Sequence, residues 1–247
     1  MANMTYLITG ANRGIGRGLV AGFLARQNTT VIATVRSLDS LTSITLKDLP
    51  KGDGSRLEIL AVNTPADFNS LPAALAAKGI QQIDVVVANA GASSGHKPTF
   101  QTTAEEITAD LEVNSVLPVR TFLSTWPLLQ KAGPGAKFII IGSILGSIGS
   151  MPNMNVPGVG YAMSKAATHL YGKKLALDFE THGLFVGILH PGWTKTPLGQ
   201  NIADAIGMKE PSVPLEASVG GCIKVIDDLN AESSGKFQVY DGTSLPW

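Results

Sequence analysis

The sequence has little of what marks secreted, nucleic-acid-binding or membrane proteins. Its single cysteine, Cys222, cannot form an internal disulfide, which fits a reducing compartment. Lys plus Arg and Asp plus Glu both number 19, so the formal net charge is zero and no overall field attracts nucleic acid or an anionic membrane. Any phosphate that the protein binds must therefore be held by a local device.

Long apolar runs and targeting signals are also missing. No apolar run reaches membrane-spanning length, and residues 1–20 lack a basic region followed by an apolar run and a cleavage site. We expect a soluble, cytoplasmic protein with no nucleic-acid or membrane partner and no metal site. The chain has no linker, repeat or low-complexity segment, and 44% hydrophobic residues among 247 suffice for one large core. One domain over residues 1–247 is expected.

The amino end contains a strand, a glycine-rich turn and a helix in direct succession. An apolar run at 5–9 enters Gly10-Ala-Asn-Arg-Gly14-Ile-Gly16, after which apolar residues recur at helical spacing. In this context Gly10 permits a tight turn, and Gly14 and Gly16 let the backbone approach a pyrophosphate at the positive end of the helix. The pattern predicts a dinucleotide site; an ordinary strand-to-helix turn is the alternative.

The end of the second predicted strand, 30–35, indicates which dinucleotide is bound. An acidic residue there would accept hydrogen bonds from a free ribose 2′-hydroxyl, whereas a basic residue pairs with a 2′-phosphate. Here Arg36 follows the strand, and Arg13 in the glycine turn offers a second guanidinium. NADP(H) is therefore predicted; the alternative is that both arginines are solvated loop residues.

Strands and helices alternate along the rest of the chain. Strands are predicted at 57–62, 83–88, 137–142, 185–190 and 237–240, and helices at 38–46, 67–78, 105–113, 114–131, 161–181 and 214–228. The strand at 83–88 is apolar enough to be covered on both faces, as in a parallel sheet. The fold class predicted is α/β, a Rossmann-type doubly wound parallel sheet flanked by helices. Pro118 and Pro127 should bend the helix at 114–131.

Residues that could take part in catalysis or ligand binding follow the predicted strands. Asn89-Ala90-Gly91 comes after 83–88, Ser143 after 137–142, and Pro191-Gly192 with Thr194 after 185–190. In open parallel sheets the ligand crevice lies beyond the carboxyl ends of the strands, so these groups should meet there. His190 precedes a proline and is expected to pack inside the strand end. His96, a lone loop histidine, is interpreted as solvated or as shaping the substrate site, and neither histidine is predicted to be catalytic.

Tyr161 and Lys165 are four residues apart on a predicted helix and so share one face. The ammonium is expected to depress the phenol pKa, which lets the phenol exchange a proton near neutral pH. The alternative is an exposed tyrosine lying on a lysine stem.

With these motifs assembled, the chain resembles the short-chain dehydrogenase/reductase family over essentially its whole length. Thr9 to Gly16 resembles the cofactor turn of that family, Ala88 to Gly91 its Asn-Ala-Gly element, and Pro191-Gly192 with Thr194 its nicotinamide-side loop. The catalytic tetrad of the family matches Asn114, Ser143, Tyr161 and Lys165. Residues 13–20 and 241–247 resemble fungal ketoreductases of the norsolorinic acid ketoreductase kind, which suggests an aromatic polyketide ketone. The family's adenine-contacting Asp after the third strand is absent, which leaves a backbone or Asn63 contact, and Ala88 replaces the first Asn of Asn-Asn-Ala-Gly.

The resemblance implies NADPH-dependent reduction of a ketone to a secondary alcohol. Tyr161 would be the general acid, Ser143 a second donor to the carbonyl, and Lys165 a ligand of the nicotinamide ribose, while Asn114 would orient a water connecting Lys165 to solvent. The coenzyme residues are predicted to be Gly10, Asn12, Arg13, Gly14, Ile15, Gly16, Arg36, Asn63, Asn89, Ala90, Gly91, Tyr161, Lys165, Pro191, Gly192 and Thr194. The alternative is an NADP-binding protein with a non-redox role, in nucleotide sensing or directed cyclisation.

The substrate pocket is expected to come from residues 92–100, 144–160 and 193–210, with Trp247. Its large apolar residues favour a bulky hydrophobic or aromatic ketone; they are Met151, Met154, Trp193, Leu198, Ile202 and Met208. Residues 198–210 are either a small core helix or a lid over the substrate. The resemblance also implies that the helices at 114–131 and 161–181 could pair in a homodimer or homotetramer.

Overall fold

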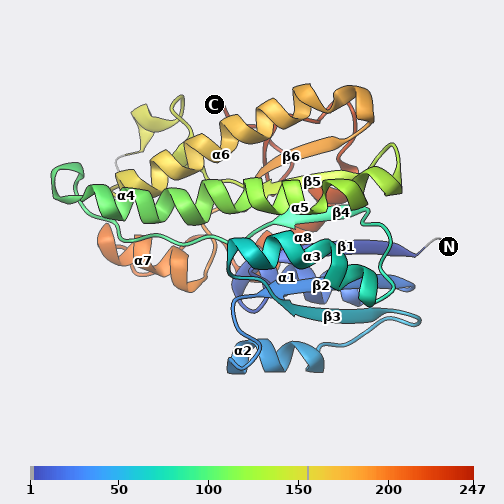
Figure 1. Ribbon diagram of the computed structural model, residues 1–247. Coiled ribbons are helices and arrows are strands. Elements are labelled where there is room, and N and C mark those ends of the chain that lie inside the picture. Colours follow the sequence, from blue (N-terminus) through green and yellow to red (C-terminus); the bar gives the residue numbers. More distant parts are fainter. Residues whose placement is uncertain (1–2, 155) are drawn as a thin grey trace.

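Seven strands form one parallel sheet in the order β3-β2-β1-β4-β5-β6-β7 (Figure 1). The structure, a computed structural model, describes residues 3–154 and 156–247. The strands are β1 (Met4–Thr9), β2 (Thr29–Val35), β3 (Arg56–Ala61), β4 (Val85–Ala88), β5 (Lys137–Ile141), β6 (Phe185–His190) and β7 (Phe237–Val239). The chain reverses its direction of travel across the sheet between β1 and β4, which places a crevice at their carboxyl ends.

Helices cover both faces of this sheet. In Figure 1, α3 (Pro65–Ala77), α5 (Leu117–Ala132) and α6 (Val159–Asp178) lie in front of the strands, and α4 (Ala104–Leu111) lies to the left of α5, beyond the strand ends. The opposite face carries α1 (Gly14–Leu24) and α8 (Leu215–Asp228), while α2 (Leu41–Ile44) lies beside β3 and α7 (Pro197–Ala205) lies beyond the strand ends. The predicted doubly wound α/β fold in a single domain is confirmed.

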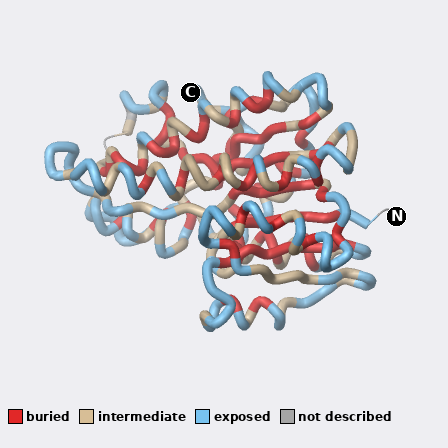
Figure 2. The backbone as a smooth tube through the Cα atoms, in the orientation of Figure 1, coloured by how far each residue is buried: buried red, intermediate tan, exposed pale blue. Residues whose placement is uncertain are grey.

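The core is divided into two layers by the sheet, because successive strand residues point to opposite faces. Leu7 and Val86 face the layer that includes α3, α5 and α6, whereas Ile8 and Val87 face the layer of α1 and α8. Figure 2 shows the buried residues concentrated along the strands and on the inward sides of the helices. Cys222 is fully buried in α8, as a small apolar residue would be.

Several predicted boundaries are wrong where local geometry departs from ideal periodicity. The predicted helices 105–113 and 114–131 are in fact α4 and α5 joined by a π-helical segment, Glu112–Val116. Pro118 has no amide hydrogen to donate to the carbonyl of residue 114, so a regular α-helical pattern cannot continue there. Pro127 lies inside α5. The predicted helix 38–46 is α2 followed by a 3₁₀ turn, Thr45–Asp48.

The predicted loop 144–160 is shorter and more structured than expected. It contains 3₁₀ turns at Ile144–Gly146 and Met151–Asn153, and α6 begins at Val159 rather than Tyr161. That helix ends at Asp178 and is followed by a further turn, Glu180–His182. Across the described ranges 3–154 and 156–247, no helix is long and apolar enough to cross a membrane.

Candidate active site

A cavity of about 490 Å³ opens at the carboxyl ends of the strands. This size suits a ligand of coenzyme or drug dimensions. Its wall contains, among the described residues, every residue predicted to bind coenzyme, and Ser143 with them. Asn114 is the exception among the predicted site residues because it lies behind the wall, its Oδ1 3.0 Å from where a Cβ on Gly91 would be. The expectation that a crevice lies beyond the carboxyl ends of the strands therefore located the cavity correctly.

Asn89 holds the glycine-rich turn against the end of β4. Its Nδ2 donates to the carbonyls of Thr9 and Gly10, at 2.8 and 3.3 Å. In return, Thr9 Oγ1 accepts from the amides of Asn89 and Ala90, both at 3.0 Å. Gly10 has φ of +63°, and a Cβ there would lie 2.8 Å from Ala90 Cα, so the two turns can meet only at a glycine.

The first turn of α1 is left without a protein cap. Within the described part of the chain, Arg13 at the N-cap makes no side-chain capping hydrogen bond, and no acidic residue stands in the first turn. By contrast, α3 and α4 both begin with a complete capping box, from Thr64 with Asp67 and from Thr103 with Glu106. Uncapped amides and the positive end of the helix dipole together form an anion site. This end of the cavity therefore fits a dinucleotide pyrophosphate.

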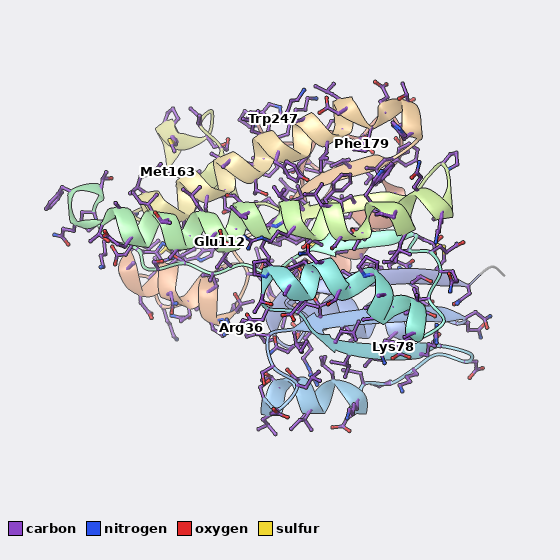
Figure 3. All side chains as sticks on the ribbon, in the orientation of Figure 1. Arg36, Lys78, Glu112, Met163, Phe179 and Trp247 are labelled. Atoms are coloured by element: carbon purple, nitrogen blue, oxygen red, sulfur yellow. The ribbon has the colours of Figure 1, made fainter. Side chains whose placement is uncertain are left out.

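Two guanidinium groups border the same region. Arg13 and Arg36 are exposed and line the cavity, and Figure 3 shows Arg36 at the edge of the sheet where β2 ends. Asn12 Nδ2 donates to Thr42 Oγ1 at 2.7 Å, which links the glycine turn to α2. The positive charges at this edge suit a phosphorylated ribose.

Asn63 borders the cavity, but its backbone amide is already occupied. The amide donates to the Asp67 carboxylate at 2.9 Å, so only the exposed Asn63 side chain and carbonyl can contact a ligand. Val62 and Phe68 line the wall beside it and were not predicted. Val62 directly follows β3 and could have been predicted, because residues after parallel strands border the crevice. Phe68 lies on α3, where no such pattern indicates it.

Tyr161 and Lys165 are both buried on the first two turns of α6 and border the cavity with Ser143. The Lys165 Nζ donates to the carbonyl of Ile141 at 2.8 Å and lies 5.6 Å from the centroid of the Tyr161 ring. The alternative of an exposed tyrosine resting on a lysine stem is therefore wrong, since Tyr161 is 7% exposed and Lys165 4%.

The expected depression of the phenol pKa is also wrong. Burial raises the pKa of Tyr161 to about 12; the Ser143 hydroxyl acts to lower it and the Asp110 carboxylate to raise it further. Burial lowers the pKa of the Lys165 ammonium to about 8. Desolvation disfavours the charged form of each group, and this effect exceeds the attraction that spacing on a helix suggested.

Asn114 is fixed within the π-helical segment by three side-chain hydrogen bonds. Its Oδ1 accepts from the amide of Ala92 at 3.0 Å, and its Nδ2 donates to the Ala92 carbonyl at 2.8 Å and to Ser164 Oγ at 3.0 Å. The side chain thereby joins the segment after β4 to α6, directly behind the residues that face the cavity.

An apolar part of the cavity wall comes from the loop after β5, from the segment after β6, and from α7 with the residue that follows it. It consists of Leu145, Met154, Val156, Trp193, Leu198, Ile202 and Ile206. Trp193 Nε1 donates to the carbonyl of Gly199 at 3.0 Å, which attaches α7 to the end of β6. Met154, Trp193, Leu198 and Ile202 thus lie where the sequence placed them. Within the predicted segment 198–210, Leu198, Ile202 and Ile206 face the cavity.

Other pocket predictions are wrong. Met151, Met208 and Trp247 lie outside the wall; the two methionines are about half exposed, and Trp247 is stacked on Phe237. Of residues 92–100, Ala92 reaches the cavity, whereas His96 lies edge-on to the Tyr161 ring at 6.1 Å, its Nδ1 3.1 Å from the Pro157 carbonyl. These residues belong to loops whose paths depend on distant contacts.

Known proteins resemble this chain over nearly its full length. The sequence profile described as short chain dehydrogenase matches residues 4–207. The norsolorinic acid ketoreductase of Dothistroma septosporum is 37% identical over 250 residues, 98% of this chain and 92% of the relative. That of Aspergillus parasiticus is 34% identical over 248 residues, 98% and 90% of the two chains. The crystal structure of NADPH-bound carbonyl reductase from chicken fatty liver has a TM-score of 0.88 at 28% identity and covers 100% of both chains.

These matches confirm the resemblance that the motifs indicated, including the similarity to fungal ketoreductases. The strand order, the glycine turn and the placement of Ser143, Tyr161 and Lys165 at one cavity agree with it. The chain belongs to the short-chain dehydrogenase family and is an oxidoreductase.

Proposed function

We propose that the protein reduces a bulky, hydrophobic ketone to a secondary alcohol with NADPH. The observation that supports this most is the composition of one cavity: an uncapped helix end with two arginines, an apolar wall, and Tyr161 with Ser143. The cavity therefore combines groups that can bind phosphate, groups that can bind an apolar substrate, and a proton donor, as a coenzyme and its substrate require.

Each residue has a definite part in the reduction. NADPH, when bound, supplies the hydride that adds to the carbonyl carbon. Tyr161 gives its phenolic proton to the carbonyl oxygen, and the Ser143 hydroxyl donates a second hydrogen bond to that oxygen, which stabilises the developing negative charge. Lys165, whose ammonium lies beside the ring, holds a positive charge near the phenolate left behind.

Further residues orient the coenzyme and the proton path. The α1 amides at Gly14, Ile15 and Gly16 receive the pyrophosphate, and Arg13 and Arg36 receive the 2′-phosphate. The turns at Gly91 and at Pro191-Gly192 with Thr194 border the nicotinamide half, and Lys165 binds its ribose. Asn114 positions a water that replaces the proton of Tyr161 through Lys165.

The coenzyme part of the proposal is tested by reversing the charge that would bind the 2′-phosphate. Arg36→Asp is expected to raise the KM for NADPH by about tenfold or more, the effect of losing a charge-assisted contact, while leaving the KM for NADH unchanged or lower. Lys51→Asp is a matched control, because it makes the same charge change at an exposed site that does not line the cavity. Equal effects on both coenzymes would contradict the assignment of NADPH.

The substrate part is tested by stopped-flow oxidation of NADPH with a panel of carbonyl compounds. Bulky aromatic ketones, which the two ketoreductase relatives and the apolar wall favour, should outperform small polar aldehydes in kcat/KM. Better turnover of small aldehydes would contradict the substrate class. Binding of NADPH without its oxidation by any member would favour nucleotide sensing, and a changed product without NADPH consumption would favour directed cyclisation.

Self-association and location complete the proposal. Leu123 on α5 and Leu170 and Leu177 on α6 are more than half exposed, which supports a homodimer or homotetramer through these two helices. Sedimentation velocity of the protein and of Leu170→Glu tests this; a wild-type monomer at micromolar concentration contradicts it.

A cytoplasmic location is supported by the single buried cysteine and is tested by microscopy of a fluorescent fusion.

A further inference from the structure

The segment after β5 satisfies its backbone amides in an unusual way. The last ladder bond runs from the Gly142 amide to the Leu189 carbonyl, at 2.8 Å. The next two amides then donate to imidazoles, Ser143 to His169 Nε2 at 3.2 Å and Ile144 to His190 Nδ1 at 3.4 Å. Buried amides need an acceptor, so two side chains replace the sheet at the point where Ser143 turns into the cavity.

His169 is held tightly in its place on α6. It is 2% exposed and lies one helical turn beyond Lys165. A Cβ on Gly142 would be 2.7 Å from its Nε2, so the imidazole can approach the backbone only because residue 142 is glycine. The Phe237 ring lies 4.4 Å from the imidazole centroid, and Trp247, labelled beside α6 in Figure 3, lies 6.4 Å away. These contacts fix the direction of the nitrogen lone pair.

His190 approaches the same segment from the neighbouring strand, β6. It is the last residue of β6, is 9% exposed and borders the cavity. Its carbonyl accepts from the Tyr240 amide at 2.9 Å, which fixes its backbone to the strand beyond. The two histidines thus reach consecutive amides from α6 and from β6.

Both rings must be neutral to accept these bonds. Burial lowers the pKa of His169 to about 3, and Lys165 and His190 act in the same direction. Burial also lowers the pKa of His190 to about 4, with Lys165 assisting and Asp241 opposing. Both imidazoles are therefore neutral at neutral pH. Since His169 accepts at Nε2, its proton is on Nδ1, and since His190 accepts at Nδ1, its proton is on Nε2.

The Ser143 hydroxyl is oriented by the same arrangement. Its Oγ accepts from the Leu145 amide at 3.2 Å, which uses an oxygen lone pair and leaves the hydroxyl hydrogen available to a carbonyl. The direction of the hydroxyl therefore depends on the backbone path through Ser143 and Ile144.

We propose that His169 and His190 are positioning residues of the reduction, which hold Ser143 in its donating orientation by accepting its own amide hydrogen and that of Ile144. The inference rests on the proposed function for its kinetic consequence. Neither histidine needs to touch the substrate for this role.

The kinetic test compares variants that keep an acceptor with variants that remove it. Gln places an oxygen near the His169 Nε2 position and Asn one near the His190 Nδ1 position, whereas Leu offers none. We expect His169→Leu and His190→Leu to lower kcat for ketone reduction by about tenfold, the rate equivalent of one hydrogen bond, with the KM for NADPH within about twofold. His169→Gln and His190→Asn should restore most of the rate. His182→Leu, at an exposed histidine beyond the end of α6, is the matched control and should keep full activity.

A second measurement separates positioning from general destabilisation. In a Ser143→Ala background the two Leu substitutions should cause no further loss of kcat, because they act through the missing hydroxyl. Wild-type kcat in both Leu variants, or a full additional loss in the Ser143→Ala background, would overturn the proposal.

Hydrogen exchange tests the same contacts without any substrate. The Ser143 amide should lose protection in His169→Leu and the Ile144 amide in His190→Leu, and both should stay protected in the Gln and Asn variants. If the wild type reduces no ketone, the proposed function fails, and the exchange pattern still decides the role of the histidines. Unchanged protection of both amides in the Leu variants would contradict the proposed role of His169 and His190.

Discussion

At the scale of single residues, the buried phenol of Tyr161 is suited to giving a proton rather than taking one. Its pKa is raised to about 12 by burial, so the group is fully protonated at neutral pH. An alkoxide formed from a ketone is a stronger base than this phenolate, and transfer from Tyr161 to it is downhill. The raised pKa therefore agrees with reduction, although it contradicts the depression expected from the Lys165 spacing.

Replacing Tyr161 with Phe removes the proton donor and preserves the ring. We expect kcat for ketone reduction to fall by about 10²–10⁴, the usual contribution of a general acid, because no other acid replaces the phenol. The Kd for NADPH, measured by fluorescence titration, should change by no more than about tenfold, since one hydrogen bond at most is lost. Near-normal turnover of Tyr161→Phe would remove Tyr161 from the acid role.

The charge of Lys165 should set the alkaline limit of the reaction. Because burial lowers its pKa to about 8, the ammonium is charged below that pH and neutral above it. A charged Lys165 stabilises the phenolate and a neutral one does not, so kcat for reduction should be level below pH 8 and decline above it. A pH profile of kcat at saturating NADPH measures this. A profile that stays level to pH 10 would contradict the proposed role.

At the scale of elements, the helices differ in how their first turns are capped, and among the described residues α2, α3, α4 and α7 have a side-chain cap whereas α1 has none. The helices α3 and α4 cap their own first turns, and α1 leaves its first turn to a ligand. The sequence predicted α1 and its turn, since glycines, strand and helix are contiguous. It did not predict the π-helical segment at Glu112–Val116, because a five-residue hydrogen-bond pattern leaves no periodicity in the apolar residues. Pro118 was its local sign, interpreted only as a bend.

The π-helical segment should depend strongly on Asn114. Asn114→Ala leaves the Ala92 amide and carbonyl without their partner in a site where Asn114 is 1% exposed, so we expect the free energy of unfolding to fall by about 2–3 kcal/mol. Ser115→Ala, next in the same segment, removes one bond to the Ser164 carbonyl and should cost about 1 kcal/mol. Urea unfolding of both variants gives the comparison. Equal losses would show that Asn114 is not the main anchor of the segment.

At the scale of the whole molecule, the sequence identified what parallel-sheet topology determines and missed what distant segments bring together. The residues after β1, β4, β5 and β6 meet because parallel strands end at one edge, and this follows from strand order. The position of His169 depends on contacts between α6, Phe237 and Trp247. The positions of Met151 and Met208 outside the cavity wall depend on the paths of their loops. Such contacts join residues far apart in the chain, and no local pattern records them.

The two buried histidines should also make the whole fold sensitive to mild acid. Their pKa values in the folded protein, about 3 for His169 and about 4 for His190, lie well below the ordinary value of about 6.5 that they regain on unfolding. Below pH 6.5 the unfolded chain therefore binds protons that the folded chain does not. Stability is full above that pH and falls on acidification by up to about 1.4 kcal/mol per pH unit for each histidine until the folded values are reached.

Urea unfolding at pH 7.5 and 5.5 measures this loss in a range where the carboxylates scarcely titrate. The difference in the free energy of unfolding between the two pH values should be about halved in His169→Gln and in His190→Asn, because each variant removes one of the two groups that take up a proton on unfolding. His182→Gln should leave the difference unchanged, since that side chain is exposed in the folded protein. A wild-type stability that is the same at both pH values would mean that the folded protein admits protons to His169 and His190, and the neutral imidazoles that accept from Ser143 and Ile144 would then not persist in mild acid.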